Sequence, residues 1–479
     1  MMRKCIAEYG MFLILAALLA IASPPAAAQD QQAANPPYSL AEYNAFQAAS
    51  GQTNPQAKIQ ACDDFVSKFP KSVLLPLIDE MYYSAYTQVK NYPKVIESVD
   101  NFLAIPDDKF TALNITKDLL LGKRLTALYQ RAVAFNQVFK DTDPNPQDEL
   151  TKAREDALQG LKMLGELAKP ANMADDQFKE QKKPLSILFN YTAGSASYQM
   201  KNYKDAIDSF TAELADNPTD AQTYFRIGVA YLQLAAKQAP QAAPGGGTAP
   251  TSSTADPAGQ QPVADLYMNG FWSLGRAIGL KGPGEAQMRT YLRAQMFNYE
   301  QPACGPLLDQ QMDELIQLAT NAPTRPATYS IPSAADLGKV LQASNLLSIL
   351  GDLQAGGDKA KTTWLAACGQ EIPDVVGKII DVAPGTDSVD IKVFTAATGE
   401  AIMAGTTANL DVNVAGQPEA ATLEKGNQIK FTGTLAKYDA QPLLVYFDKG
   451  KVDPSSFPTE KKEKVPGKKK PGGAGRGRG

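Results

Sequence analysis

The chain has 479 residues, enough for two or three domains, and it contains no histidine. The absence of histidine removes the usual general base near neutral pH, the commonest metal ligand and every catalytic triad that needs an imidazole. The net charge of −4 is unevenly distributed, because residues 460–479 carry +6 and residues 1–28 carry +1, which leaves −11 on the body. An acidic body argues against nucleic acid as its partner.

Residues 1–28 have the three-part pattern of a secretory signal peptide. Arg3 and Lys4 precede the apolar run 11–22, and Ala26-Ala27-Ala28 offers a small-residue cleavage site. The apolar run is too short to span a membrane comfortably, and no later segment approaches the required length, so we expect no transmembrane segment in the mature chain. We therefore predict export, to the periplasm or the cell exterior if the host is bacterial.

Residues 36–237 are predicted to form pairs of helices. Apolar side chains recur at helical spacing in 40–50, 56–69, 78–89, 93–103, 115–139 and 148–169. The string Lys90-Asn91-Tyr92-Pro93 mirrors Lys201-Asn202-Tyr203-Lys204 further along the chain. Each string is predicted to form the turn between the two helices of a pair, where proline in a first helical turn is well tolerated.

The stretch 188–234 has the most specific spacing in the chain. Its first part carries Gly194, Ala206, Phe210 and Pro218, and its second part carries Tyr224, Ile227, Gly228 and Tyr231. In this spacing the chain resembles the tetratricopeptide repeat, a helical hairpin of about 34 residues. The resemblance implies an array of hairpins with a concave groove for partner chains. An ordinary pair of amphipathic helices is the alternative.

The resemblance also assigns a groove, because the first helix of each repeat lines the concave face. The side chains at those positions are Tyr191, Ser195, Tyr198, Gln199, Gln222, Phe225, Val229 and Gln233, together with Leu188 and Leu232. A face of this composition suits a peptide or a helix with apolar anchors. The alternative is that Phe225 and Leu232 only pack on neighbouring helices. The lysine and arginine clamps used for carboxylate-ended ligands are missing from these positions, so we do not expect such a ligand.

Residues 238–262 are rich in Pro, Gly, Ala, Ser and Thr and are predicted to be a disordered insertion. Residues 263–368 are predicted to continue or cap the helical array, with helices at 263–280, 287–297, 306–320, 334–353 and 359–367. Three cysteines remain after signal cleavage, and the odd count leaves at least one without an intramolecular partner. Since export permits disulfides, we predict that Cys304 and Cys368, both near predicted helix ends, are bonded and that Cys62 is the cysteine left over.

The hydrophobic period changes in residues 371–453. Alternation in 389–393, 410–414 and 429–435, with apolar runs at 375–382 and 443–447, predicts five strands and a short helix at 419–424. This order resembles the OB-fold barrel, although a small β-sandwich would show the same alternation. Residues 459–479 are rich in Lys, Pro and Gly and are predicted to be a disordered basic tail.

The expected fold class is therefore mostly α: a tetratricopeptide-like helical-hairpin solenoid, a small all-β OB-like domain and a disordered basic tail. The chain resembles the tetratricopeptide repeat proteins exported to bacterial cell envelopes, which organise protein complexes. The function that this resemblance implies is a non-enzymatic scaffold that binds protein partners through its concave face, with no cofactor. No cysteine pair has metal-ligand spacing, and the absence of histidine makes a zinc site implausible. We expect no catalytic residue and no nucleic-acid partner.

A second hypothesis is an envelope protein that binds a polyanion or a glycan. The OB-like domain would hold the ligand together with the tail, whose basic residues are Lys468, Lys469, Lys470, Arg476 and Arg478. A weak contact between the tail and a polyanion is also compatible with the scaffold hypothesis. A hydrolase that uses aspartate or glutamate is a third and more distant hypothesis.

Overall fold

The computed structural model describes residues 36–140, 142, 146–239, 262–396 and 406–458. The predicted signal peptide, the basic tail and nearly all of the predicted insertion lie outside these residues. No helix in the described part of the chain is long and apolar enough to cross a membrane. The chain divides into two compact units. Of the described residues, the first unit holds 36–239, 262–295 and 311–330, and the second holds 296–310 and 331–458.

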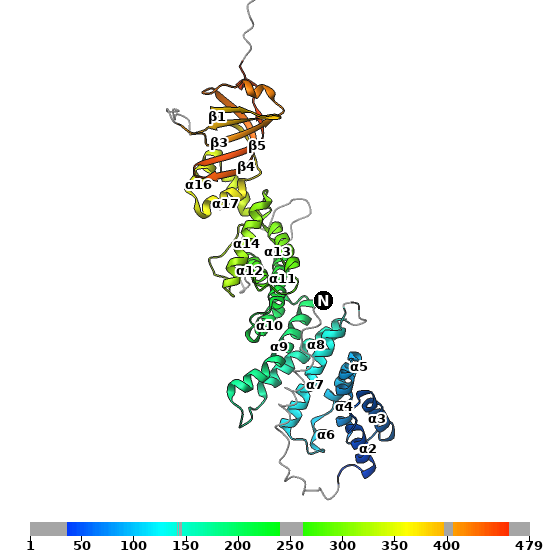
Figure 1. The fold of residues 1–479 in the computed structure, drawn as a ribbon. Helices are drawn as coiled ribbons and strands as arrows, with labels where there is room; N and C mark the ends of the chain where they lie inside the picture. The colour runs from blue at the N-terminus through cyan, green and yellow to red at the C-terminus, as the bar shows by residue number, and fades with distance from the viewer. Residues whose placement is uncertain (1–35, 141, 143–145, 240–261, 397–405, 459–479) are drawn as a thin grey trace, which may run out of the picture. The chain divides into compact units, whose positions relative to one another are not determined.

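The first unit is helical throughout (Figure 1). Its helices are α2 (Leu40–Ser50), α3 (Pro55–Lys68), α4 (Leu75–Gln88), α5 (Tyr92–Leu103), α6 (Asp107–Thr111), α7 (Lys117–Val138), α8 (Pro146–Glu166), α9 (Asp175–Gln199), α10 (Tyr203–Asp216), α11 (Ala221–Gln238) and α12 (Val263–Gly279). Helices α13 (Glu285–Glu300) and α14 (Gly305–Asn321) contribute to both units. The short helix α6 is the one element here that the periodicity did not predict, because five residues are too few to show a helical period.

Local signals in the sequence explain where these helices begin. Ser39 caps α2 in a capping box with Glu42, and Asn54 caps α3 just before Pro55. Thr116 caps α7 through a bond from the backbone N–H of Leu119 to its hydroxyl oxygen. These side chains satisfy backbone donors that a helix start would otherwise leave free.

The two strings that mirror one another in the sequence adopt the same turn. Lys90 and Lys201 both have left-handed backbone, with φ of 58° and 61°. The following residue closes each turn: Asn91 N–H donates to the Tyr86 carbonyl at 2.9 Å, and Asn202 N–H donates to the Ser197 carbonyl at 2.8 Å. This hydrogen bond to the carbonyl five residues back is typical of a helix that ends in a left-handed residue. The shared sequence therefore encodes a shared geometry.

Glycines allow successive helices of the first unit to pack closely. A Cβ atom at Gly194 on α9 would lie 2.7 Å from the ring of Phe210 on α10. A Cβ atom at Gly228 on α11 would lie 2.7 Å from Leu274 on α12. The two glycines that match one another in the repeat spacing are thus both sites of close helix contact, and the space that each leaves is filled by a large side chain of the next helix.

This packing predicts opposite effects of the same substitution at two glycines. Gly194→Ala is expected to destabilise the first unit by about 1–3 kcal/mol, because the buried Phe210 ring must move. Gly165→Ala, where nothing lies within 4 Å of the added Cβ, is expected to stabilise the unit by up to about 1 kcal/mol through better helix propensity. Denaturant unfolding followed by circular dichroism measures both, and shifts of the same sign would contradict this packing.

The second unit contains three short helices and a β-barrel (Figure 1). Its elements are α15 (Ala334–Ala343), α16 (Leu346–Ala355), α17 (Gly357–Ala367), β1 (Glu371–Pro384), β2 (Ser388–Phe394), β3 (Leu410–Ala415), the 3₁₀ helix η2 (Pro418–Thr422), β4 (Gln428–Ala440), β5 (Leu443–Val452) and η3 (Pro454–Ser456). The single helix predicted at 334–353 is two helices. The first ends at Ala343, and Asn345 caps the start of the second, in a capping box with Ser348.

The five strands form a closed barrel in the order β1-β2-β3-β5-β4. The β3–β5 pair is parallel, and the other four pairs are antiparallel. Along β2 the side chains of Val389, Ile391 and Val393 are buried, whereas Asp390 and Lys392 face outward. This alternation is the pattern from which the strand was predicted. The predicted short helix before the fourth strand corresponds to η2.

Helices α16 and α17 share the hydrophobic core of the barrel. Ile349, Leu353 and Trp364 belong to the same buried cluster as the inward side chains of the strands. The Trp364 ring lies 4.9 Å from that of Tyr438 on β4, measured between centroids. A disulfide joins Cys304 to Cys368, with 5.9 Å between the Cα atoms. The segment 263–368, predicted as one helical continuation of the array, is thus shared between the two units, because these contacts hold its end to the barrel.

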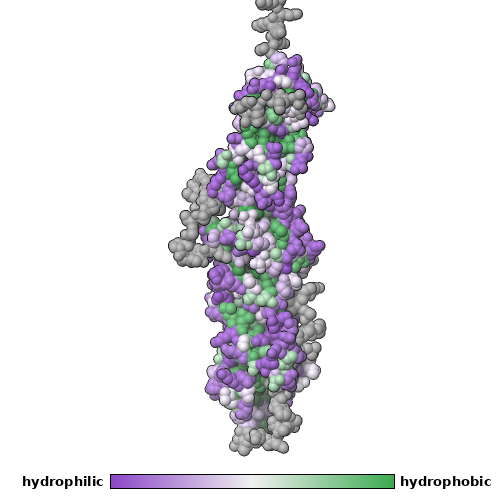
Figure 2. Space-filling view, turned by 90° about the vertical axis from the view of Figure 1, so that its left-hand side faces the viewer, coloured by the Kyte–Doolittle hydropathy of each residue, from purple (hydrophilic) through white to green (hydrophobic). Residues whose placement is uncertain are grey.

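The surface of the described residues mixes polar and apolar side chains. Figure 2 shows hydrophobic patches between hydrophilic ones on the face that it presents. Amphipathic helices that bury one stripe and expose the other give a surface of this kind. A candidate site must therefore be located from its geometry as well as from its hydrophobicity.

Candidate functional site

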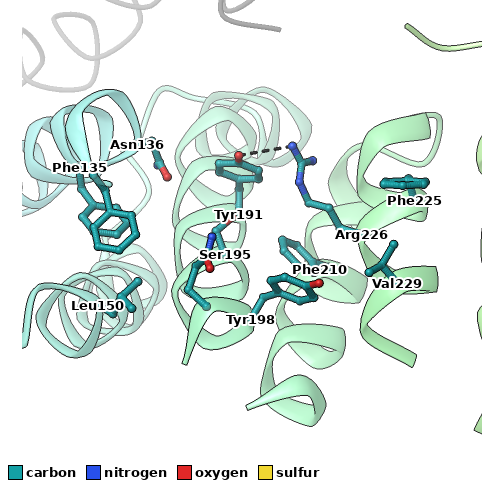
Figure 3. Close-up of a pocket in the computed structure, with 12 residues that line it drawn as sticks. Phe135, Asn136, Leu150, Tyr191, Ser195, Tyr198, Phe210, Phe225, Arg226 and Val229 are labelled. Carbon is teal, nitrogen blue, oxygen red and sulfur yellow. Dashed lines mark hydrogen bonds between the residues drawn. The ribbon is translucent and has the colours of Figure 1, made fainter. Parts of the chain in front are cut away.

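A pocket of about 370 Å³ lies in the first unit, between helices α7 to α11 (Figure 3). We call it the aromatic pocket. Its lining residues are Phe135, Asn136, Phe139, Leu150, Tyr191, Ser195, Tyr198, Gln199, Phe210, Phe225, Arg226 and Val229. Six of the eight side chains predicted for a groove are among them. Gln222 and Gln233 are the two that are not.

Helical spacing explains how those six side chains converge. Tyr191, Ser195 and Tyr198 stand four and three residues apart on α9, so they share one face of that helix. Phe225 and Val229 are related in the same way on α11. The two faces are turned toward the same space, as Figure 3 shows. Side chains at equivalent positions of α9 and α11 therefore line the pocket together.

The floor of the aromatic pocket is formed by buried side chains from other helices. Phe135 on α7, Leu150 on α8 and Phe210 on α10 are 4%, 5% and 1% exposed. The Tyr191 ring lies 6.4 Å from that of Phe210 between centroids. Apolar walls with a few polar groups are typical of ligand sites in proteins.

The remaining predicted groove residues have other surroundings. Gln222 donates a hydrogen bond to the carbonyl of Pro283, near the start of α13, and Gln233 is exposed. Leu232 is 4% exposed and lies against Gly270 of α12, so it is a core residue. Phe225 lines the pocket and also contacts Tyr291 of α13, at 5.7 Å between ring centroids. Leu232 therefore only packs on a neighbouring helix, as the alternative hypothesis for these two residues stated. Phe225 both packs on a neighbouring helix and lines the pocket.

Sequence reasoning missed the lining residues of α7 and α8, and it missed Arg226. The first group comes from a part of the chain where the repeat spacing is irregular, so no template pointed to Phe135 or Leu150. Arg226 had a usable signal. It precedes Val229 by three residues on α11 and must therefore share a helix face with that predicted groove residue.

Arg226 brings a positive charge to the aromatic pocket. Its guanidinium carbon lies 4.8 Å from the centroid of the Tyr191 ring. One guanidinium nitrogen, Nη2, also donates to the Tyr191 hydroxyl oxygen across 3.4 Å. A guanidinium over an aromatic face is attracted by the negative face of the ring. Arg226 forms no ion pair with any residue that the structure describes.

Glu213 on α10 is the carboxyl group whose pKa responds to Arg226. Burial raises the pKa of Glu213 to about 7, against opposing effects of a hydrogen bond from Thr223 and of the Arg226 charge. The Thr223 hydroxyl donates to Oε1 at 3.0 Å, and Oε2 accepts no hydrogen bond from any described residue. Below neutral pH this carboxyl is therefore mostly uncharged and does not neutralise the positive charge of Arg226.

A pH-dependent stability follows from Glu213. Because its folded pKa of about 7 lies above the unfolded value of about 4.3, folding binds a proton between these pH values. The contribution of Glu213 to the free energy of unfolding is thus present near pH 4 and is lost as pH rises to 7. The difference in free energy of unfolding between Glu213→Gln and the unsubstituted chain is expected to shift in favour of the variant by about 1–3 kcal/mol when pH rises from 4.5 to 8. Parallel stability profiles over that range would contradict this assignment.

A second pocket, between α8 and α9, carries charge of both signs. Four lysines line it, Lys169, Lys179, Lys182 and Lys183, beside Asp175 and Asp216. Lys169 pairs with Asp175, and Lys183 pairs with Glu180, both at 2.5 Å. Two of the four lysines therefore have their charge neutralised by an ion pair with an acidic side chain. No group of acidic residues and cysteines in the described part of the chain has the arrangement of a metal site.

Comparison of the chain with protein-family models, with curated proteins and with solved structures returns no match.

Proposed function

We propose that this chain is an exported, non-enzymatic scaffold and that the aromatic pocket binds a segment of a protein partner. The pocket is the observation that carries the proposal. It joins aromatic walls from α9 and α11 to a buried apolar floor, with polar groups between them. Such a lining suits a peptide or helix that inserts an apolar anchor. The pattern of residues 1–28, which resembles a signal peptide, supports the export part of the proposal.

The tetratricopeptide resemblance supports the proposal from a second side. Helices next to one another in the chain pack together from α2 to α12, with the short α6 set aside. The left-handed turn recurs at Lys90 and Lys201, and the close glycine contact recurs at Gly194 and Gly228. Recurrent turns and recurrent contacts are expected of an array in which each unit packs on its neighbours. In our proposal the array holds the pocket in a fixed shape.

The strand order β1-β2-β3-β5-β4 in a closed barrel agrees with an OB-like domain. Binding of a polyanion by this barrel is disfavoured by its charge. Residues 371–453 contain 12 acidic and seven basic residues. Two of the acids stand on adjacent strands, where burial and the charge of Asp390 raise the pKa of Asp411. A barrel with a net negative charge repels phosphate or sulfate polymers.

The test is a comparison of pocket variants in capture of partners from the cell envelope. The mature chain, Tyr191→Ala, Phe225→Ala and Tyr43→Ala would be used side by side. Tyr43 is a matched control, an aromatic of the first unit that is 41% exposed and does not line the pocket. The proposal expects protein partners that are lost with the two pocket variants and kept by Tyr43→Ala. Retention of every partner by both pocket variants would refute it.

A further inference from the structure

The guanidinium of Arg226 stands in the aromatic pocket without a carboxylate partner among the described residues. This distinguishes it from the arginines of α7 and α8, which are paired with acidic side chains. Arg131 and Arg154, for example, are paired with Asp100 and Asp205 at 2.8 Å. A positive charge beside apolar walls is poorly solvated and gains most from a negative charge that a ligand brings.

The contacts of Arg226 also hold it at the pocket. Its plane is positioned by the Tyr191 ring and hydroxyl, which belong to the opposite wall (Figure 3). A single bond of 3.4 Å uses only one of five guanidinium N–H groups. The remaining donors have the fork geometry that matches the two oxygens of a carboxylate.

A second polar group of the lining is complementary to a peptide. The Asn136 amide nitrogen donates to the Ala132 carbonyl at 2.9 Å and to the Thr192 hydroxyl at 2.7 Å, which uses both of its hydrogens. The Asn136 oxygen therefore remains as an acceptor in the lining. An N–H group of a ligand could therefore donate to the Asn136 oxygen. An apolar side chain of the same ligand would pack on the aromatic walls, and a carboxylate would accept from Arg226.

We propose that the aromatic pocket binds an acidic peptide segment of a protein partner, in which an aromatic or large aliphatic side chain lies beside an aspartate or glutamate that pairs with Arg226. This inference rests on the function proposed above and adds the chemistry of the partner. A phosphate group fits less well, because Arg226 is the single cationic residue of the lining and a dianion calls for more than one.

Peptides selected from a displayed library of random twelve-residue sequences test this inference on the full chain. Each selected peptide would be measured by fluorescence anisotropy together with a copy in which Asp or Glu is replaced by Asn or Gln. The protein forms are the unsubstituted chain, Arg226→Gln, Arg226→Lys, Tyr191→Ala and, as a matched control, Arg289→Gln. Arg289 is a half-exposed arginine of the same unit that is paired with Asp313 and is not among the residues that line the pocket.

The expected result is enrichment of sequences that join an apolar residue to an acidic one. Arg226→Gln should weaken such a peptide about tenfold or more, and Arg226→Lys should weaken it less, because the charge remains while the fork is lost. The amide copy of the peptide should bind the unsubstituted chain as weakly as the acidic peptide binds Arg226→Gln. Arg289→Gln should have no effect.

Two outcomes separate the inference from the proposal on which it rests. Peptides that Tyr191→Ala weakens but that bind equally well as acid and amide copies would overturn the carboxylate inference and leave the pocket as the binding site. Peptides that Tyr191→Ala does not weaken would overturn the proposed function itself. The comparison of acid and amide copies uses the unsubstituted chain and therefore does not depend on the folding of any variant.

Discussion

Replacement of Arg131 by alanine is expected to destabilise the first unit by about 3–5 kcal/mol. Arg131 on α7 is 1% exposed and is one of the largest fully buried side chains described. Its Nε lies 2.8 Å from a carboxylate oxygen of Asp100 and 3.0 Å from one of Asp156. Removal of the guanidinium would leave the largely buried Asp156 without its main partner.

The pKa of Asp156 indicates how this destabilisation should depend on pH. Burial raises the pKa of Asp156, although Arg131 and Lys152 oppose that effect. Without Arg131 the folded pKa must rise further, so the folded variant binds a proton more readily than the unfolded chain does. The variant should therefore recover part of its stability as pH falls and lose it again as pH rises through the folded pKa.

Denaturant unfolding at pH 4.5 and pH 7.5 measures both effects. Lys152→Ala is the matched control, because the Lys152 amine also lies near Asp100 and Asp156, at 3.5 and 3.4 Å, but its side chain is 42% exposed. An exposed ion pair contributes about 1 kcal/mol or less. Equal effects of the two substitutions would show that burial of Arg131 does not govern this network.

Loss of the disulfide between Cys304 and Cys368 is expected to destabilise the second unit by about 4 kcal/mol. The two cysteines are 64 residues apart in the sequence, and closing a loop of that length removes much entropy from the unfolded chain. Cys368 is 2% exposed and belongs to the core cluster on which Cys304 packs, so the bond also joins the α13–α14 connection to the end of α17.

Thermal unfolding of the unsubstituted chain and of the double variant Cys304→Ser, Cys368→Ser checks this prediction. The melting temperature of the second unit should fall in the double variant. A reductant should lower the melting temperature of the unsubstituted chain to a similar value and leave that of the variant unchanged. A reductant effect of equal size on both proteins would contradict the assignment, because the remaining Cys62 is free and buried.

Much of the secondary structure could be predicted because its signals are local. Helix α2 was predicted from its apolar spacing with the bounds that the structure has, 40–50. In the structure Ser39 caps its start and Gly51 caps its end. The strand β2 was found from the alternation of Val389, Ile391 and Val393. The prediction was wrong at 334–353, where the cap at Asn345 separates two helices that share a similar apolar pattern.

The candidate site could be predicted only in part. Most lining residues that belong to the repeat-like segment were found, whereas residues brought to the pocket by contacts between distant segments were not. Tyr191, Tyr198 and Phe225 were named because the tetratricopeptide resemblance assigns their positions to the concave face. Phe135 and Leu150 reach the same pocket from helices with no clear repeat spacing, so their proximity depends on how α7 and α8 pack. The absence of an ion pair at Arg226 likewise depends on what surrounds it in space.

By itself the sequence determined most of the helical and strand segments, their order and the absence of histidine chemistry. These properties depend on backbone propensity, on capping and on periods of two or 3.6 residues, all of which act over a few neighbouring positions. Tertiary structure alone decided the closure of the barrel, the attachment of α16 and α17 to it, the enclosed space of the aromatic pocket and the unpaired charge within that pocket. Each of these depends on contacts between residues far apart in the chain, and local sequence does not specify which distant surfaces meet.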